Sequence, residues 1–163
     1  MGAVGQRGFT LIEILVVLAI IGIMVGLAGM RMMPDDDRTL HGEAQRLALL
    51  LEQARDQAVA SGEPIAFSMA PRGYRFWSLN ADNRWVPRGG DELLRDRALA
   101  DGVRLAALQV NQSSLSADAR LLFLPSGGNA PFTADLALNA AHARIRGDSL
   151  GRVRIETREA ATE

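Results

Sequence analysis

An uncharged, apolar stretch at Ile14–Met30 constrains the fold of this chain more than any other feature. As a helix it would be about 25 Å long, or about 33 Å if it began at Phe9, which is enough to cross the core of a bilayer. Arg31 follows the stretch, and the leader Met1–Gly8 carries Arg7 but no acidic residue. Because positively charged leaders stay in the cytoplasm, the rest of the chain is predicted to lie across the membrane.

Two common kinds of apolar segment do not account for this stretch. A secretory signal peptide has an apolar region of about 7–15 residues that ends at small residues, whereas this one is longer and runs into Arg31–Pro34. A plain membrane anchor leaves Glu13 unexplained, because an acidic residue costs roughly 2.5–3.5 kcal/mol at the bilayer centre and less near its surface. We therefore expect Glu13 to have a partner of opposite charge.

The residues Gly8–Glu13, with the sequence GFTLIE, resemble the processing motif of type IV pilins and type II secretion pseudopilins. The resemblance implies that the prepilin peptidase cleaves between Gly8 and Phe9 and that Phe9 is then N-methylated. It also implies that Glu13 pairs with the freed α-amino group of a neighbouring subunit during assembly, since each charge needs an opposite one in lipid. The protein would cross the bacterial inner membrane once, with a cytoplasmic N-terminus and a periplasmic body.

Four segments are predicted: a leader at 1–8 that is removed, a transmembrane helix at 9–33, the amphipathic half of a spine helix at 34–62, and a β-rich domain at 63–163. Pro34 ends or kinks the apolar helix, and Asp35–Asp37 is expected to cap the next one. Gly62 and Pro64 mark the C-terminus of that helix. Its apolar stripe recurs at spacings of three and four residues: Leu40, Ala44, Leu47, Leu51, Ala54 and Ala58.

Beyond Gly62 the pattern changes to short strands separated by turn residues, and it predicts an α+β, pilin-like fold with an antiparallel β body. The stretch Asp91–Ala100 is ambiguous, and a short helix is one interpretation of it. The Ser-rich segment Asn111–Asp118 is expected to be an exposed loop. The strand candidates are 64–70, 74–80, 84–86, 103–110, 121–124, 132–138, 142–146 and 152–157, with a hairpin connection at 147–151.

Composition argues against an enzyme, a metal site and a cofactor. There is no cysteine, which excludes disulfides, thiolate zinc sites and a cysteine nucleophile. The two histidines, His41 and His142, are too few for a zinc site and are expected on the surface. Ser126 lies between turn residues without a G-x-S-x-G context, so it is interpreted as a turn serine. Neither a small-molecule substrate nor a cofactor is expected.

A second resemblance concerns the body. Ser126-Gly127 followed by Pro131-Phe132 is similar to the S-G-x-x-x-P-F feature of H-type minor pseudopilins of type II secretion, and Tyr74–Pro87 is similar to the early meander of that family. The end of the amphipathic helix is shared with the related FimT/FimU minor pilins. The resemblance implies a structural subunit near the tip of the pseudopilus. It would join the I-, J- and K-type tip subunits to the G-type major subunit and help export folded proteins across the outer membrane.

Four arginines near the C-terminus leave an alternative open: Arg144, Arg146, Arg152 and Arg154. Strand alternation places the arginines of each strand on one face. They are interpreted either as the solvated face of a hairpin or as a DNA-contacting patch, since Gly151–Arg154 resembles the G-R-x-R feature of DNA-binding FimT minor pilins. The body carries 16 arginines and 18 acidic residues beyond Pro34. This balance, together with the S-G-x-x-x-P-F feature, favours the secretion protein, and a nucleic-acid partner is not expected.

Overall fold

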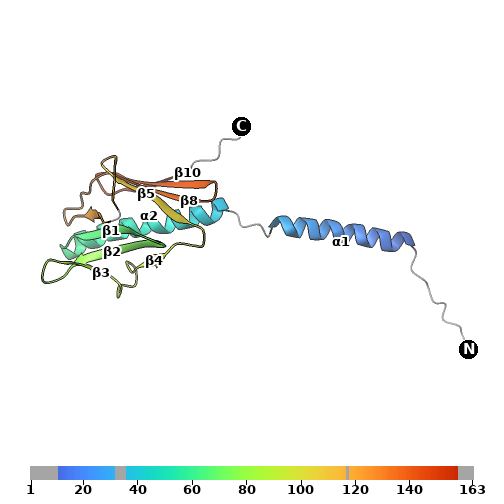
Figure 1. Ribbon diagram of the computed structural model, residues 1–163, viewed down its shortest axis with the longest axis horizontal. Coiled ribbons are helices and arrows are strands. Elements are labelled where there is room, and N and C mark those ends of the chain that lie inside the picture. Colours follow the sequence, from blue (N-terminus) through green and yellow to red (C-terminus); the bar gives the residue numbers. More distant parts are fainter. Residues whose placement is uncertain (1–10, 32–35, 117, 158–163) are drawn as a thin grey trace, which may run out of the picture. The chain divides into compact units, whose positions relative to one another are not determined.

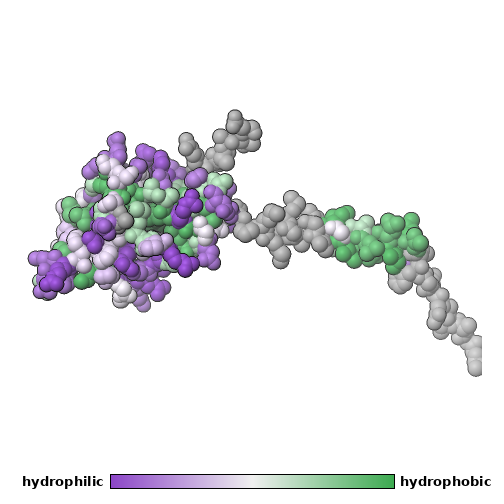
Figure 2. Space-filling model, viewed as in Figure 1, coloured by the Kyte–Doolittle hydropathy of each residue, from purple (hydrophilic) through white to green (hydrophobic). Residues whose placement is uncertain are grey.

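The computed structural model describes residues 11–31, 36–116 and 118–157, and the chain divides into two units, Met1–Asp35 and Asp36–Glu163 (Figure 1). The first unit contains α1 (Leu11–Arg31). Its side chains from Leu11 to Met24 are exposed, and hydrophobic residues dominate its surface in Figure 2. Among the residues that the structure describes, no helix combines the length and hydropathy needed to cross a membrane. The transmembrane assignment of 9–33 therefore stays a prediction.

The second unit begins with α2 (Asp36–Ser61), whose apolar stripe is fully buried. All six predicted stripe residues face the core, and Ala48 and Leu50 join them. Gly62 ends the helix as predicted: its φ is +71°, and its N–H donates to the carbonyl of Ala58 at 3.1 Å. A left-handed glycine in this position satisfies a helix-terminal carbonyl without strain. Pro34 and Asp35 lie outside the described residues, so the continuity of a single spine helix stays a prediction.

The strands form two antiparallel sheets. The first sheet has the order β3-β2-β1-β7, with β4 paired to β2, and the second has the order β10-β9-β8-β5-β6. The strands of the first sheet are β1 (Ile65–Ala70), β2 (Gly73–Leu79), β3 (Trp85–Pro87), β4 (Arg97–Ala98) and β7 (Leu121–Phe123). Those of the second sheet are β5 (Arg104–Val110), β6 (Ser113–Ser114), β8 (Phe132–Leu138), β9 (Ala141–Gly147) and β10 (Val153–Thr157).

The hydrophobic core lies between α2 and the two sheets. α2 contacts β8, β9 and β10 of the second sheet and β1 and β7 of the first (Figure 1). Phe67, Tyr74 and Phe76 form an aromatic cluster with ring centroids 5.3–6.0 Å apart. Burying one such side chain contributes about 1.5–3 kcal/mol. All core residues of the described part of the chain lie in Asp36–Glu163, so this unit has a hydrophobic core of its own, and we expect it to fold alone.

Two segments differ from the sequence-based expectations. Asp91–Ala100, all of it described, contains no helix; it is a bend that leads into β4. The Asp91 carboxylate accepts hydrogen bonds from the N–H groups of Leu93 and Leu94, which turns the chain and buries Leu94. In the segment Asn111–Asp118, Asn111 to Ser114, Ser116 and Asp118 are exposed as expected, whereas Leu115 packs against the core. Asn111 and Gln112 have positive φ and close a tight hairpin in which β6 pairs with β5. Positive φ at both central residues suits such a turn.

Candidate functional site

Of the predicted processing and assembly residues, Glu13 alone lies among the described residues. It is in the first turn of α1 and is exposed. Gly8 and Phe9 lie outside the described residues. The side chains that surround Glu13 along α1 are apolar on every side, from Leu11 to Met24. A helix that is hydrophobic all round requires an apolar environment or partner helices.

The four predicted arginines do share one surface, the outer face of the hairpin formed by β9 and β10. Arg146 pairs in register with Arg154, and Arg144 with Glu156. All four guanidinium-bearing side chains are exposed, whereas the alternate residues Ala143 and Ile145 face the core. All four arginines are thus on the surface, and their role as an interaction patch stays a prediction. Arg152 lies in the turn, one residue before β10 begins.

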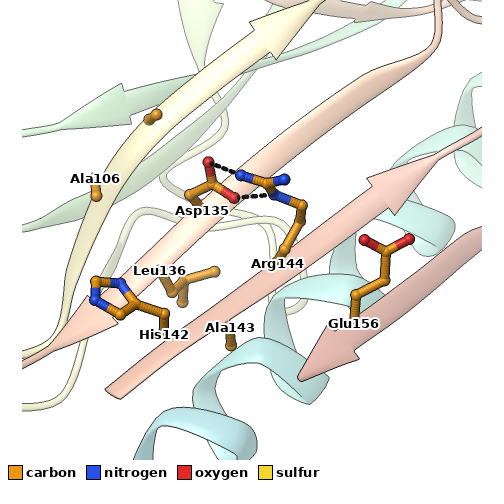
Figure 3. A pocket seen from close by; sticks show the side chains of 8 residues that line it. Ala106, Asp135, Leu136, His142, Ala143, Arg144 and Glu156 are labelled. Carbon is orange, nitrogen blue, oxygen red and sulfur yellow. Dashed lines mark hydrogen bonds and ion pairs between the residues drawn. The ribbon is translucent and has the colours of Figure 1, made fainter. Parts of the chain in front are cut away.

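Carboxylates neutralise three of these arginines. One edge of the Arg144 guanidinium donates two hydrogen bonds to the carboxylate of Asp135 in β8, at 2.6 Å from Nε and 3.0 Å from Nη2 (Figure 3). Arg146 contacts Glu156 at 3.3 Å, and Arg152 contacts Asp148 at 2.9 Å. The hydrogen bonds to Asp135 raise the pKa of Arg144, and the hydrogen bond from the Arg152 N–H lowers the pKa of Asp148. Arg144 and Asp148 therefore both stay charged near neutral pH, and each faces a partner of opposite charge.

The sequence could not reveal the role of Asp135. It lies nine positions before Arg144, and only the register of β8 against β9 places the two side chains opposite each other. A period-two alternation in both strands was the one available clue, since it puts both residues on the outer face. Arg154 has no ion pair within the described part of the chain. The face as a whole is therefore nearly neutral rather than a basic patch.

The same face is hollowed by an open pocket of about 560 Å³ (Figure 3). Small side chains on β5, Ala106 and Ala107, form one wall, and His142, Arg144 and Glu156 form the other. A bulge in β5 between Leu105 and Ala107 shifts the register there. The pocket presents charges that are already paired, and a guanidinium of raised pKa donates hydrogen bonds but does not exchange protons near neutral pH.

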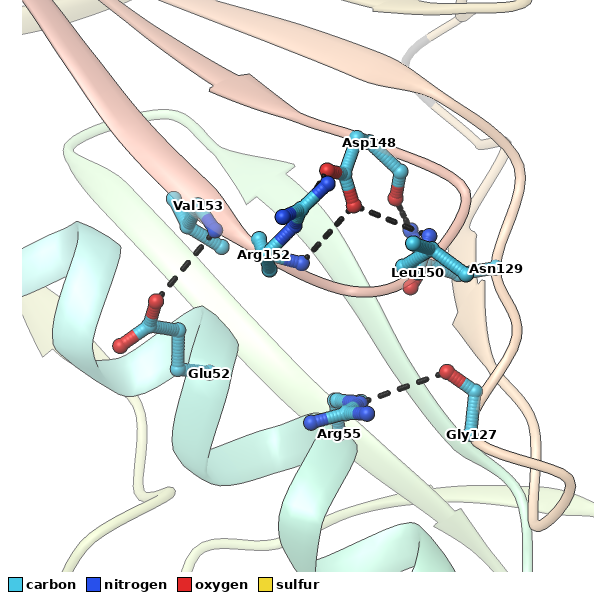
Figure 4. A network of polar contacts seen from close by, with 8 residues as sticks. All are labelled: Glu52, Arg55, Gly127, Asn129, Asp148, Leu150, Arg152 and Val153. Carbon is cyan, nitrogen blue, oxygen red and sulfur yellow. Dashed lines mark hydrogen bonds and ion pairs between the residues drawn. The ribbon is translucent and has the colours of Figure 1, made fainter.

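The S-G-x-x-x-P-F segment lies in a junction that joins α2 to the β9–β10 hairpin (Figure 4). Nε of Arg55 in α2 donates to the carbonyl of Gly127 at 3.3 Å. The side-chain amide of Asn129, which is buried, donates to the carbonyl of Asp148 in the hairpin turn at 3.2 Å. The N–H of Val153 donates to Glu52 of α2 at 3.3 Å. Ser126 is exposed in the turn, as predicted.

Close packing explains the glycines and the phenylalanine of this junction. A Cβ on Gly147 would lie 2.0 Å from the ring of Phe132, and a Cβ on Gly151 would lie 2.5 Å from Nε of Arg55. Phe132 in turn packs edge-on against Phe123, with ring centroids 6.3 Å apart. The motif thus positions a loop between the two sheets and the helix, a structural role.

Two segments of the chain match known protein families. Residues 43–151 match the family described as type II transport protein GspH, and residues 4–29 match the prokaryotic N-terminal methylation motif. The chain belongs to the GspH family. The family segment includes most of α2, the meander and the S-G-x-x-x-P-F loop, and it ends at Gly151, before Arg152 and Arg154.

Individual relatives of this GspH-family chain include both secretion and pilin-like proteins. The type II secretion system protein H of Aeromonas hydrophila is 26% identical over 175 residues, covering 92% of this chain and 93% of that protein. The pilin-like protein PilA1 of Thermus thermophilus is 31% identical over 158 residues, covering 93% and 99%. The body also superposes on a solved structure, the crystal structure of the minor pseudopilin EpsH from the type II secretion system of Vibrio cholerae. The TM-score is 0.63 at 18% identity, and the match covers 74% of this chain and 97% of EpsH. This similarity supports the fold.

Proposed function

We propose that this GspH-family protein is a minor pseudopilin, a structural subunit of the type II secretion pseudopilus. The observation that carries the proposal is the family match over residues 43–151, which spans the packing helix, the first-sheet meander and the junction around Gly127. A filament subunit needs an N-terminal helix and a folded body, and the chain has both, in α1 and in the Asp36–Glu163 unit.

Processing and anchoring follow from the N-terminal segment. After cleavage between Gly8 and Phe9, the apolar residues up to Arg31 hold the protein in the inner membrane with its body in the periplasm. The match of residues 4–29 to the methylation motif supports this proposal. Glu13 then pairs with the new α-amino group of a neighbouring subunit, because both charges are costly in lipid when they are alone.

The proposed partners are the other pseudopilins: the G-type major subunit and the I-, J- and K-type subunits of the tip. The prepilin peptidase acts on the protein as its processing enzyme. Export of folded proteins would then depend on this subunit through assembly of the filament, not through a reaction that it catalyses.

The alternative function is a FimT/FimU-like minor pilin of the type IV pilus, involved in pilus assembly or in DNA binding and uptake. The likeness to the pilin-like protein PilA1 supports a pilin, and the Gly151–Arg154 sequence supports DNA binding. The ion pairs of Arg144, Arg146 and Arg152 argue against it. If these arginines bound phosphates, their ion-pair partners Asp135, Glu156 and Asp148 would either have to move away or lie close to the polyanion. Carboxylates that lie close to a polyanion are repelled by it.

Deletion of the gene distinguishes the two functions. We expect the deletion strain to lose exoproteins from the culture medium and to retain them in the periplasm, and expect the wild-type gene to restore export. Transformation frequency, measured in the same strains, should remain unchanged. Normal export with a loss of DNA uptake would contradict the pseudopilin assignment and support the pilin.

A further inference from the structure

The outer face of the first sheet carries both tryptophans of the chain. In β2, Tyr74 and Phe76 face the core, so Trp77 and Leu79 point to the opposite side of the sheet. Cross-strand pairing then assigns their neighbours, since residues directly opposite share a face. We call the resulting surface the Trp77 face; its apolar members are Ala66, Trp77, Leu79, Trp85, Pro87 and Leu122.

Trp77 is held in place at the centre of this face. Its indole N–H donates to Oγ of Ser68 at 2.9 Å, and Ser68 is itself buried. Two guanidinium groups lie over the ring: Cζ of Arg120 is 4.3 Å from the ring centroid and Cζ of Arg75 is 5.4 Å from it. Cation–π contacts at these distances fix the arginines as well as the indole.

The two arginines differ in their charge balance. Arg75 is ion-paired with Asp96 at 2.6 Å. Arg120 has no ion pair within the described part of the chain, and its Nε is buried without a hydrogen-bond partner. Leu122, two residues further on, is 41% exposed. The Trp77 face therefore combines a preorganised, uncompensated cation with an apolar platform.

We propose that the Trp77 face docks a different protein chain that presents a carboxylate beside an apolar side chain. The guanidinium of Arg120 would bind the carboxylate with paired hydrogen bonds, and Trp77 and Leu122 would cover the apolar group. Tryptophan and arginine are the residue types that most often dominate binding at the centre of an interface. The proposal rests on the proposed function, under which the partner is another pseudopilin.

Charge complementarity decides against a second copy of this chain as the occupant. A symmetric contact would place the same surface on both sides and bring two Arg120 groups close together, and the carboxylate beside Trp77, that of Asp96, is already paired with Arg75. A different chain with a matching carboxylate supplies the opposite charge that Arg120 lacks.

The test uses the tryptophans of this face as its own reporter. Both tryptophans of the chain, Trp77 and Trp85, belong to the face, so the Asp36–Glu163 body is titrated with the soluble body of each other pseudopilin while the indole emission is followed. We expect one of them to shift the emission to shorter wavelength. Arg120→Glu should weaken that binding at least tenfold, and reversing the matching carboxylate on the partner to arginine should restore most of it.

Arg104→Glu is the matched control, because Arg104 is an exposed arginine of the second sheet, likewise without an ion pair within the described residues. Its binding should stay within about twofold of the parent, and circular dichroism should show that both charge-reversal variants are folded. Binding that is unaffected by Arg120→Glu would overturn the Trp77 face and leave the pseudopilin function standing. Binding to no other pseudopilin would contradict both the Trp77 face as a docking site and the pseudopilin function. An emission shift that depends on the concentration of this protein alone would identify a second copy as the occupant and overturn the proposal.

Discussion

Single carboxylates set the local charge at several points of this protein. Asp135 holds Arg144 on the outer face of the second sheet, and Asp148 closes the β9–β10 turn by accepting from the N–H groups of Leu150 and Arg152. Asp91 performs a similar task in the first sheet: it accepts from two backbone N–H groups and pairs with Arg88 at 2.6 Å. Such groups couple folding to pH because only the ionised form accepts all of these bonds.

Asp91→Asn should destabilise the body by about 1–2 kcal/mol at neutral pH. Burial raises the pKa of Asp91, but the hydrogen bonds from Arg88, Leu94 and Leu93 outweigh it and lower the pKa from 3.8 to about 2. A lowered folded pKa means that the contribution is complete above about pH 4 and is lost as the pH falls to about 2. Urea unfolding at several pH values should therefore show the difference between wild type and variant shrinking over this range. Asp82→Asn, at an exposed turn position, is the control; an equal, pH-independent loss in both variants would contradict this role.

Glu13→Ala should be cleaved by the prepilin peptidase like the wild type but should enter filaments poorly. The physical reason is that the α-amino group of the neighbouring subunit loses its counter-charge in an apolar environment. Mass spectrometry of the processed N-terminus measures cleavage, and the amount of the protein in sheared filaments measures assembly. Glu13→Asp, which keeps the charge, is the conservative control. Normal incorporation of the alanine variant would rule out charge pairing.

At the scale of elements, the body depends on how α2 docks against the β9–β10 hairpin. The stripe from Leu40 to Ala58 provides the apolar contact, and Arg55 and Glu52 add polar bonds to Gly127 and Val153 at its edge. Each of these bonds has one charged partner, and hydrogen bonds to charged groups contribute about 1.5–3 kcal/mol. A further constraint is steric, because the hairpin turn approaches the Arg55 side chain closely at Gly151.

Gly151→Ala should destabilise the body by about 1–3 kcal/mol. Gly151 has a φ of +78°, and a Cβ there would lie 2.5 Å from Nε and 2.7 Å from Cδ of Arg55. Thermal and urea unfolding measure the loss, and Gly90→Ala, at a position with no atom within 4 Å of the added Cβ, should change stability by less than about 0.5 kcal/mol. In an Arg55→Ala background, Gly151→Ala should cost only the free energy of placing an alanine at positive φ, because the contact with the Arg55 side chain is gone. An unchanged penalty there would show that Arg55 does not restrict the turn.

At the scale of the whole molecule, the Asp36–Glu163 unit carries its own core and presents two outer sheet faces of different character. The outer face of the second sheet is polar and charge-balanced, with Asp135 and Glu156 among its arginines. The Trp77 face of the first sheet is apolar with one uncompensated guanidinium. Figure 2 shows hydrophilic residues over much of the visible body surface, in contrast to α1.

The isolated Asp36–Glu163 body should bind duplex DNA no more tightly than micromolar at about 50 mM salt, and more weakly at about 200 mM. Its acidic groups outnumber its basic ones, and three of the four hairpin arginines are already paired. Fluorescence anisotropy with a labelled duplex measures the affinity. Sub-micromolar binding that disappears in Arg152→Gln/Arg154→Gln would contradict a purely structural function.

The sequence by itself determined the class of this protein and most of its elements. The stripe from Leu40 to Ala58, the turn at Gly62 and the alternation in the strands depend on local periodicity and backbone preference, which neighbouring residues set. Tertiary structure decided the rest. Asp91 turned an ambiguous segment into a bend, the register of β8 against β9 brought Asp135 to Arg144, and sheet pairing placed Arg120 over Trp77. These contacts join residues on different strands or across loops, and their partners are fixed by strand order and register, which a local pattern does not contain.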